Sequence, residues 1–516
     1  MSNFFYVLKF LINNFKRYKK IKRDAKILIE LFDYKASIIS NGIFANVLKD
    51  INNAEIVGYE PRFLTLKQKI KNLVGKLNFF NYVNLYKSFG FSRIVIPKRN
   101  RKIFNLAKNK YEKLIKQIKK KKDILNFSFK GIYFGDILYD TYLREKTLST
   151  IDFKTKEFQN YFFKFFELFY FWENFFSKNN IKAVVISHSV YLTALMPRIA
   201  LSKKIDVFNT GFSSVYRLTK KKPLKFSYFE DYPRQFKKFP EKIKSTKIKL
   251  AKKNLQLRLE GKEDILYNQC KRLSSPAFLY KSKLNLNTVN NKKNKKIILI
   301  SAHDFTDAPH VHENMLFTDF YEWFDFLGKI SNKIHKDYLW LVKLHPSDYD
   351  NNIQYINYFI NKYPRLVLLD KNKSHNEILK LGVSCVLTAY GSIGHEYPLF
   401  QVPVINAGNN PHIGYSFCYH PKSIKEYLLL LKLIPNLKVK KKTIKFIYEF
   451  YVMQFLVDYN LFEEIGHDQS KLNTNAIFKI FCKKFDSNRI SEVNKVYKQF
   501  IKTKNRRLYN FSMQAN

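Results

Sequence analysis

The sequence predicts an α/β protein built from two Rossmann-like domains that face a cleft, with extra C-terminal helices. A chain of 516 residues is longer than one hydrophobic core usually organises. Two stretches alternate short apolar strands with helices, which is the rhythm of parallel sheets covered by helices. A segment rich in lysine and asparagine, Lys283 to Lys296, separates them. We therefore expect a first domain over 1–285, a second over 286–440 and a helical segment over 441–516.

The first domain opens with a βαβ unit. The stretch KILIELFD, 26–33, is a uniformly apolar strand, and AEIVGYEP, 54–61, is the next. Between them the small residues Ser40–Gly42 are typical of a turn that opens a helix. A long aromatic helix over 158–180 then precedes a second strand, turn, helix and strand over 181–211.

Three titratable side chains of the first domain are candidates for a catalytic base. Residues 125–144 alternate at their start and have a helical period at their end, which places Asp136 and Asp140 on one helix face. Asp140 is favoured because Arg144, one turn later, can keep its carboxylate ionised. His188 ends a strand, where α/β proteins place ligand groups. The alternatives are a helix cap and a surface charge for the aspartates, and a hydrogen-bonded structural role for the histidine.

The second domain is the most regular part of the sequence. Apolar strands and helices alternate from Lys296 to Gly408, the pattern of a doubly wound parallel sheet. Three loops, SAHDFTDAPH, KLHPSD and YGSIGHE, each follow a strand. Because parallel strands end at one edge of a sheet, we expect these loops to meet and to bind a nucleotide-linked substrate.

The loop KLHPSD offers groups that suit a phosphate. Lys343 supplies a cation and His345 a switchable hydrogen-bond donor, while Pro346 ends the strand. A phosphate leaving group needs such partners because its negative charge grows as the sugar bond breaks. A lone His-Pro is weak by itself, and the convergence of several loops is what favours a functional site.

The loop YGSIGHE predicts an anion site at the start of a helix. Its glycines allow the backbone to approach a ligand, its serine adds a hydroxyl, and the helix offers free amides. A phosphate would repel Glu396, so this carboxylate is expected to accept hydrogen bonds from a ribose or sugar hydroxyl. His395 either faces the donor or caps the turn. The donor-site residues expected here are Tyr390, Gly391, Ser392, Gly394, His395 and Glu396.

The loop SAHDFTDAPHVHE concentrates histidine and aspartate, which are ligands of zinc and manganese. It offers no fixed helical or strand spacing, and we expect no metal. Instead we expect a loop that closes on the donor, in which Asp307 and His310 fix the backbone between them. The residues concerned are His303, Asp304, Asp307, His310 and His312.

KLHP, followed by TAYGSIGHEYPLFQVPVINAG, resembles the C-terminal domain of GT-B glycosyltransferases of bacterial surface polysaccharide assembly, the capsule-synthesis group with the CMP-Kdo transferases. Bacterial sialyltransferases and CDP-glycerol glycerophosphotransferases have a similar His-Pro and Ser arrangement. The resemblance implies metal-independent transfer, with His345 and Ser392 on the donor's phosphate. Ser392 stands alone where several of these enzymes carry paired Ser or Thr residues. UDP-N-acetylglucosamine epimerases share a related Gly/Ser turn, so the donor is expected to be CMP- or UDP-linked.

The resemblance implies a glycosyltransferase that moves a sugar from a nucleotide-activated donor, its substrate, onto a surface polysaccharide or lipid-linked glycan. No cofactor is expected. Two alternatives stay open. One is a UDP-sugar epimerase, which needs an acid/base carboxylate on each face of the sugar. The other is a non-catalytic partner in polysaccharide synthesis or export.

The charge of the chain bears on its partners. A net charge of +50 would ordinarily suggest nucleic acid or an anionic membrane surface. The lysines are spread along the chain and accompany many Asn, Ile, Phe and Tyr residues, a composition that an AT-rich coding sequence produces by itself. No nucleic-acid-binding motif is present, and we expect no nucleic-acid partner.

The N-terminus and the cysteines suggest where the protein works. MSNFFYVLKFLINNFKRYKKIKR is too short and polar to span a bilayer and lacks a signal-peptide cleavage site. It is either a basic amphipathic helix on the anionic inner membrane or an ordinary first helix packed on its domain. The cysteines are far apart in the sequence, which favours a reduced, cytoplasmic protein. They are Cys270, Cys385, Cys418 and Cys482.

Overall fold

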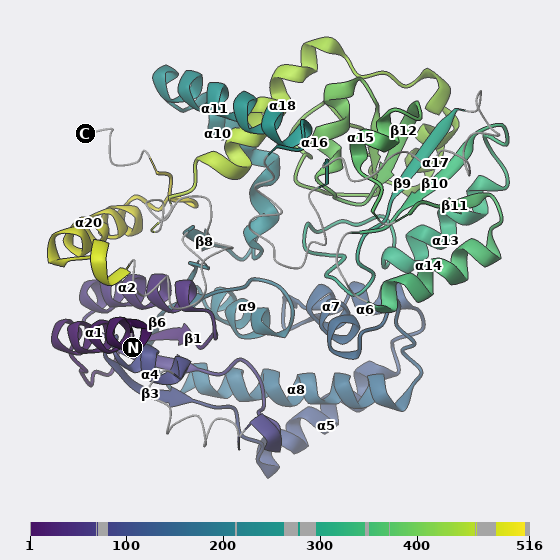
Figure 1. Cartoon of the computed structure of the whole chain (residues 1–516). Helices are drawn as coiled ribbons and strands as arrows, with labels where there is room; N and C mark the ends of the chain where they lie inside the picture. Colours follow the sequence, from purple (N-terminus) through teal and green to yellow (C-terminus); the bar gives the residue numbers. More distant parts are fainter. Residues whose placement is uncertain are drawn as a thin grey trace. The chain divides into compact units, whose positions relative to one another are not determined.

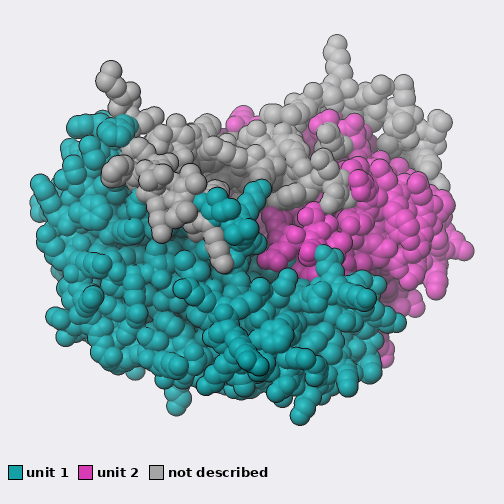
Figure 2. All heavy atoms as spheres, turned by 90° about the horizontal axis from the view of Figure 1, so that it is seen from below, with its two compact units in different colours: residues 1–141, 152–225, 457–516 teal, residues 142–151, 226–456 magenta. Residues whose placement is uncertain are grey.

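A computed structural model of the chain is shown in Figure 1. It describes residues 2–68, 70, 81–211, 214–262, 277–278, 296–345, 350–370, 372–459, 461 and 481–510. These residues form two compact units (Figure 2). Unit 1 contains residues 1–141, 152–225 and 457–516, and unit 2 contains residues 142–151 and 226–456.

The units divide the chain at other places than the expected domains. Apart from Lys296, the expected linker Lys283–Lys296 lies outside the described residues. The chain leaves unit 1 after Lys225, because α10 (Tyr232–Lys237) and α11 (Glu241–Leu259) pack on α18 (Ile444–Tyr451) of unit 2. The segment expected at 441–516 is likewise divided, and its part from Val457 onward belongs to unit 1.

Unit 1 is built on one large sheet. Its strands are β1 (Lys26–Glu30), β2 (Glu55–Tyr59), β3 (Phe91–Val95), β6 (Ile181–Ile186), β7 (Asp206–Asn209) and β8 (Tyr216–Leu218). They lie in the order β3-β2-β1-β6-β7-β8. The strands from β3 to β7 in this order pair in parallel, and β8 pairs antiparallel with β7. β1 and β2 are buried along their whole length, as expected for strands covered on both faces.

Helices cover both faces of this sheet. One core contains apolar side chains of β1, β2, β6 and β7 together with those of α1, α2, α4 and α20. The long aromatic helix predicted at 158–180 is α8, and it contacts β2 through Trp172 and Tyr59. The described residues of unit 1 include the helices α1 (Ser2–Arg17), α2 (Lys35–Asn52), α4 (Tyr82–Lys87), α5 (Arg101–Ile115), α6 (Lys121–Leu125), α7 (Gly135–Lys146, which continues into unit 2), α8 (Lys156–Ser177), α9 (Leu195–Ser202) and α20 (Ser487–Thr503). A short hairpin, β4 (Ser128–Phe129) and β5 (Ile132–Tyr133), precedes α7.

The turn expected at Ser40–Gly42 is wrong, because α2 runs through these residues without a break. Their small side chains serve close packing instead. A Cβ atom on Gly42 would lie 2.5 Å from the ring of Phe89. The Ser40 hydroxyl donates to the carbonyl of Thr210, which follows β7. This part of α2 therefore lies against its neighbours with polar contacts that larger residues would block.

The C-terminal segment completes unit 1. Tyr497 of α20 contacts Phe44 of α2, with ring centroids 5.0 Å apart. The strand edge at β8 is extended by the last described residues, because the amide of Arg217 donates to the carbonyl of Arg506 and that of Leu508 to Val215. Helix α2 and the edge of the sheet are thus both covered by the end of the chain.

Unit 2 is built on a five-stranded parallel sheet in the order β11-β10-β9-β12-β13. The strands are β9 (Ile297–Ser301), β10 (Leu339–Lys343), β11 (Leu366–Leu368), β12 (Val383–Thr388) and β13 (Val404–Asn406). Helices α13 (Phe320–Ser331), α14 (Asp350–Lys362) and α17 (Ile424–Lys432) cover one face, and α15 (His375–Leu379) and α16 (Ile393–Glu396) lie on the other (Figure 1). The predicted fold class, α/β with two Rossmann-like sheets, is confirmed. The cleft between the two domains stays a prediction.

Among the helices of the described residues, none has the length and apolar composition needed to cross a lipid bilayer.

Candidate functional site

The candidate site lies at the carboxyl-terminal edge of the sheet in unit 2. The strand order reverses between β9 and β12, because the chain adds β10 and β11 on one side of β9 and β12 and β13 on the other. Parallel α/β sheets bind ligands at such a switch point, outside the ends of the strands. The loops that follow β9, β10 and β12 all reach this point.

The three loops bring predicted residues together. The ring of His303, after β9, lies 5.2 Å from that of His345, after β10, and 4.2 Å from that of Tyr390, after β12. The ring of His312 also contacts that of Tyr390, with centroids 4.6 Å apart. The Tyr390 hydroxyl donates to the carbonyl of Ala308 over 3.0 Å, which ties the first loop to the third. We call His303, His312, His345 and Tyr390 the edge cluster.

The histidines of the edge cluster are held neutral. Burial lowers the pKa of His345 to about 4, and the nearby His303 ring acts in the same direction. Burial also lowers the pKa of His312 to about 3 and lowers that of His303. Within the described residues the Nδ1 atoms of His303 and His312 are buried and have no hydrogen-bond partner. Buried polar atoms of this kind are rare unless a ligand or water completes them.

The loop from His303 to His312 is shaped by its aspartates. Asp304 is buried and accepts hydrogen bonds from the amide and the hydroxyl of Thr306. Asp307 accepts from the amide of Ala308. His310 is buried as well. Among the described residues no group of three or more His, Cys, Asp or Glu side chains is arranged to hold a metal ion.

Lys343 ends β10, two positions before His345 of the edge cluster. Burial lowers the pKa of its ammonium group to about 8, although the carboxylates of Asp370 and Glu377 oppose this shift. The side chain therefore carries its charge at neutral pH in a partly buried place, where an electrostatic contact is stronger than in water. Pro346, predicted to end this strand, lies outside the described residues.

The Gly/Ser turn differs from the expected anion cradle. Helix α16 has only 4 residues, so its dipole is small. The amide of Gly391 donates to the hydroxyl of Thr388. A Cβ atom on Gly394 would lie 2.6 Å from the ring of His412, so this glycine is explained by packing. Ser392 is half-exposed at the turn and does not cap the helix.

His395 and Glu396 are both engaged by buried partners, and the expected role of Glu396 needs correction. The Nδ1 atom of His395 lies 3.1 Å from Nε2 of His412, and its ring contacts Phe450 of α18. Glu396 is buried, and its Oε1 accepts hydrogen bonds from Nε and Nη2 of Arg258 at 2.8 and 2.7 Å. Its carboxylate therefore holds α11 against α16, and it is not available as the expected sugar-hydroxyl acceptor.

Sequence reasoning missed the partners of these buried groups. Arg258 and His412 lie in segments without a recognisable motif. His375, which was also missed, has its Nδ1 atom 2.9 Å from the Tyr397 hydroxyl. One feature of the sequence could have indicated them. Several titratable residues stand among apolar residues, and a titratable group that is buried needs a polar or charged partner.

Unit 1 has its own switch point, between β1 and β6. His188 follows β6, and its ring lies 5.0 Å from that of Phe32. Burial lowers the pKa of His188, and within the described residues its Nδ1 has no hydrogen-bond partner. Glu30, at the end of β1, was not predicted. It accepts a hydrogen bond of 2.6 Å from the amide of Ser187 and so holds the loop that carries His188.

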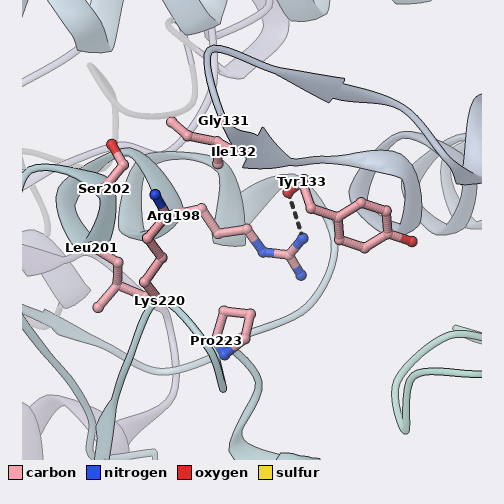
Figure 3. Close-up of a pocket in the computed structure, with 8 residues that line it drawn as sticks. All are labelled: Gly131, Ile132, Tyr133, Arg198, Leu201, Ser202, Lys220 and Pro223. Carbon is pink, nitrogen blue, oxygen red and sulfur yellow. Dashed lines mark hydrogen bonds between the residues drawn. The ribbon is translucent and has the colours of Figure 1, made fainter.

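Asp136 is not a free carboxylate, which corrects its predicted role as a base. It forms a two-pronged ion pair with Arg198 of α9, and both side chains are buried. Arg198 also donates to the carbonyl of Tyr133 (Figure 3). Asp140 is buried one turn later on α7. Arg144 donates to the Thr306 hydroxyl, and its expected pairing with Asp140 stays a prediction.

A cavity of about 130 Å³ adjoins the Arg198 side chain. It is lined by residues of the hairpin, of α9 and of the turn after β8, and Figure 3 shows these residues. Pockets for drug-sized ligands and cofactors usually have volumes of roughly 300 to 1,000 Å³. This cavity is therefore too small for a nucleotide-sugar. Its lining residues are Gly131, Ile132, Tyr133, Arg198, Leu201, Ser202, Lys220 and Pro223.

No protein-family model and no curated protein sequence matches the chain. Among solved structures, a UDP-GlcNAc 2-epimerase from Neisseria meningitidis, bound to UDP-GlcNAc, is 12% identical, with 87% of this chain and 100% of that chain covered and a TM-score of 0.23. The wall teichoic acid polymerase TagF is 11% identical, with 95% and 98% covered and a TM-score of 0.23. A glycosyltransferase from Rickettsia africae is 12% identical, with 93% and 100% covered and a TM-score of 0.25. Similarity at these TM-scores does not indicate a shared function. The fold class is established by the two sheets and the helices that cover them.

Proposed function

We propose that this protein is a metal-independent glycosyltransferase of the GT-B type that serves bacterial surface polysaccharide assembly. It transfers a sugar from a CMP- or UDP-linked donor to a surface glycan or a lipid-linked acceptor. It works in the cytoplasm, in peripheral contact with the anionic inner membrane. The proposal extends to a capsule-synthesis role of the kind that the KLHP and YGSIGHE motifs suggest.

The observation that carries the proposal is the edge cluster. Three loops from three strands place His303, His345 and Tyr390 at the switch point of the sheet, and the Nδ1 of His303 is buried without a partner. A neutral imidazole can donate one hydrogen bond to a phosphate oxygen, and Lys343 adds a positive charge nearby. Together these groups suit the phosphates of a nucleotide donor, whose charge grows as the sugar leaves.

The transfer also needs a base that takes the proton of the acceptor hydroxyl as its oxygen attacks the anomeric carbon. Among the three predicted candidates, His188 suits this role best. Its imidazole is neutral at neutral pH because burial lowers its pKa, and its Nδ1 is unpartnered within the described residues. Asp136 is already engaged by Arg198. Asp140 stays the second candidate.

Donor binding is tested with CMP-, CDP-, UDP- and GDP-linked sugars in a thermal-shift assay of the full chain. One or more donors should raise the melting temperature, and His345→Ala and His303→Ala should each reduce that shift. His335→Ala is a matched control, because His335 precedes β10 and lies at the opposite end of this strand from His345. The donor site is misplaced if no nucleotide raises the melting temperature, or if both edge variants bind as the wild type does.

Catalysis is tested separately. His188→Asn should reduce the rate of transfer by roughly 10²- to 10⁴-fold, the usual contribution of a general base, and leave donor affinity unchanged. The epimerase alternative predicts conversion of a UDP-sugar without any acceptor. The non-catalytic alternative predicts donor binding without turnover. Full activity in His188→Asn would transfer the role of base to another residue, with Asp140→Asn as the next variant to assay.

A further inference from the structure

Helix α1 is anchored on unit 1 by one of its faces. Val7, Phe10 and Leu11 are buried in the core that includes α2 and α20. The ring of Phe10 contacts that of Phe89 at 5.8 Å. Asn14 is fully buried, and its amide donates to the Ser88 hydroxyl. The helix is therefore part of the folded unit and not a loose tail.

The exposed side of the same helix presents large apolar side chains to solvent. Five of them recur at a helical spacing, so they form one continuous stripe. A contiguous stripe of this kind marks a contact surface, whereas single exposed apolar residues do not. The stripe consists of Phe4 (58% exposed), Phe5 (59%), Leu8 (41%), Ile12 (44%) and Phe15 (52%).

Positive charge lies along one flank of the stripe and beyond its C-terminal end. Lys9 and Lys16 are exposed on α1, and Lys19 and Lys20 follow directly. No acidic residue precedes Asp24. A second copy of this chain would bring like charges together, and a nucleic acid would leave the apolar stripe in water. Only an anionic lipid surface matches both features, because it takes up the apolar side chains and attracts the lysines.

We propose that α1 is a membrane-docking helix that lies flat on an anionic bilayer, with the stripe from Phe4 to Phe15 in the boundary between headgroups and acyl chains. Its 16 residues form a helix of about 24 Å, and its buried face is occupied by unit 1, so the helix lies on the bilayer and does not cross it. Docking through a helix that is part of a folded unit fixes the orientation of unit 1 to the membrane. This inference rests on the membrane contact named in the proposed function and not on the transfer reaction.

The test is co-sedimentation of the full chain with vesicles that contain phosphatidylglycerol, compared with vesicles of pure phosphatidylcholine. The wild type should bind the anionic vesicles, and added salt should weaken binding because it screens the lysines. Phe5→Ser combined with Phe15→Ser should weaken binding about tenfold or more, since burial of a single Phe side chain already accounts for such a factor. Lys16→Glu combined with Lys20→Glu should have a similar effect that is lost at high salt.

The matched control is Phe104→Ser combined with Leu106→Ser on α5, which removes two apolar side chains of similar exposure, 43% and 45%, from the same unit. All variants should stay folded, because the changed residues lie at the surface, and should respond to nucleotides as the wild type does. The α5 variant should lose a little melting temperature, since the Phe104 ring also contacts that of Phe163 at 5.3 Å. The proposal is overturned if the Phe5 and Phe15 variant binds vesicles like the wild type or if the α5 control loses binding equally. Equal binding to neutral and anionic vesicles would also overturn it. So would a wild type that binds no vesicles but self-associates, if the Phe5 and Phe15 variant is a monomer.

Discussion

Two buried carboxylates of this protein, those of Glu396 and Asp136, have partners far away in the sequence. Glu396 follows a Gly/Ser turn, a context that predicts contact with a ligand, yet its carboxylate binds Arg258, which lies 138 positions earlier. Asp136 and Arg198 form a similar pair over 62 positions. No local pattern connects such residues, because each pair exists only after two helices have packed. The residue types could be predicted to be important, and their roles could not.

Removing one partner of the buried pair should destabilise unit 2 strongly. Arg258→Ala leaves the carboxylate of Glu396 buried without its cation, which should lower the free energy of unfolding by about 3–5 kcal/mol. Urea unfolding followed by tryptophan fluorescence measures this, because Trp323 and Trp340 both lie in unit 2. As a control, Arg489→Ala breaks the exposed pair with Glu492 and should cost less than about 1 kcal/mol. Equal losses in the two variants would contradict the assigned role.

Glu30 should make the stability of unit 1 fall as the pH rises from about 4.5 to about 7. Burial raises the pKa of its carboxyl group from 4.5 to about 7, although the backbone amides of Ser187 and His188 oppose this shift. The folded protein therefore holds this proton more tightly than the unfolded chain does. The contribution to stability is complete below about pH 4.5 and is lost as the pH rises to about 7.

The measurement is the difference in unfolding free energy between the wild type and Glu30→Gln as a function of pH. Glutamine stays neutral and keeps an acceptor oxygen for the Ser187 amide. The variant should be similar to the wild type near pH 5 and more stable by about 2–3 kcal/mol near pH 8. The buried histidines are present in both proteins, so their effect cancels in the difference between the two unfolding free energies. Their lowered pKa values would otherwise reduce stability in acid, opposite to the effect of Glu30. A difference that does not change with pH would show that Glu30 titrates normally.

At the scale of elements, the strands and helices of both sheets follow from the sequence because apolar strands buried on both faces leave a strong pattern. The small-residue stretches were harder to interpret. Ser40–Gly42 lies inside α2, and Gly394 lies inside α16, although both sequences suggest a turn with a functional role. In both cases an aromatic or imidazole ring from another segment occupies the space that a side chain would need. A glycine in such a stretch indicates that another group approaches the backbone closely. The sequence alone does not distinguish a ligand from a side-chain ring.

Gly394→Ala should therefore destabilise unit 2 irrespective of any ligand. The added methyl group would lie 2.6 Å from the His412 ring, which is held by His395, and overpacking of this kind costs about 1–3 kcal/mol. Gly391→Ala is the comparison, since its nearest neighbour outside the turn is the Thr388 hydroxyl at 3.1 Å. We expect a clearly smaller loss there. A thermal melt of both variants without nucleotide decides the point, and a neutral Gly394→Ala would return this glycine to the list of ligand-binding candidates.

At the scale of the whole molecule, the number of sheets was predictable and the division of the chain was not. Length and periodicity indicate two Rossmann-like cores. The return of residues 457–516 to unit 1 depends on α20 covering α2, a contact between helices more than 400 positions apart that no periodicity reveals. The edge cluster was predictable to the extent that parallel strands bring their loops to one edge. How deeply each of these side chains is buried could not be predicted from the sequence.

The contact between α20 and α2 should be required for the stability of unit 1. Tyr497→Ala removes a fully buried ring from this contact and should cost about 3–5 kcal/mol. Limited proteolysis should then cut unit 1 before the five-stranded sheet of unit 2. Lys498→Ala, one position on and exposed, should leave the digestion pattern unchanged. Simultaneous digestion of both units in Tyr497→Ala would show that they do not unfold separately.

The discontinuous course of unit 1 sets an unusual order of events during synthesis. Domains generally fold as units while the chain emerges from the ribosome, at about 5–20 residues per second. Between Lys225 and Val457 the ribosome makes nearly all of unit 2, which takes roughly 10–50 seconds at that rate. During this interval the apolar side of α2 stays uncovered, because α20 has not yet been synthesised. Unit 1, whose synthesis begins first, is therefore the last unit to complete its fold. A chaperone that shields α2 would have to remain bound throughout the synthesis of unit 2.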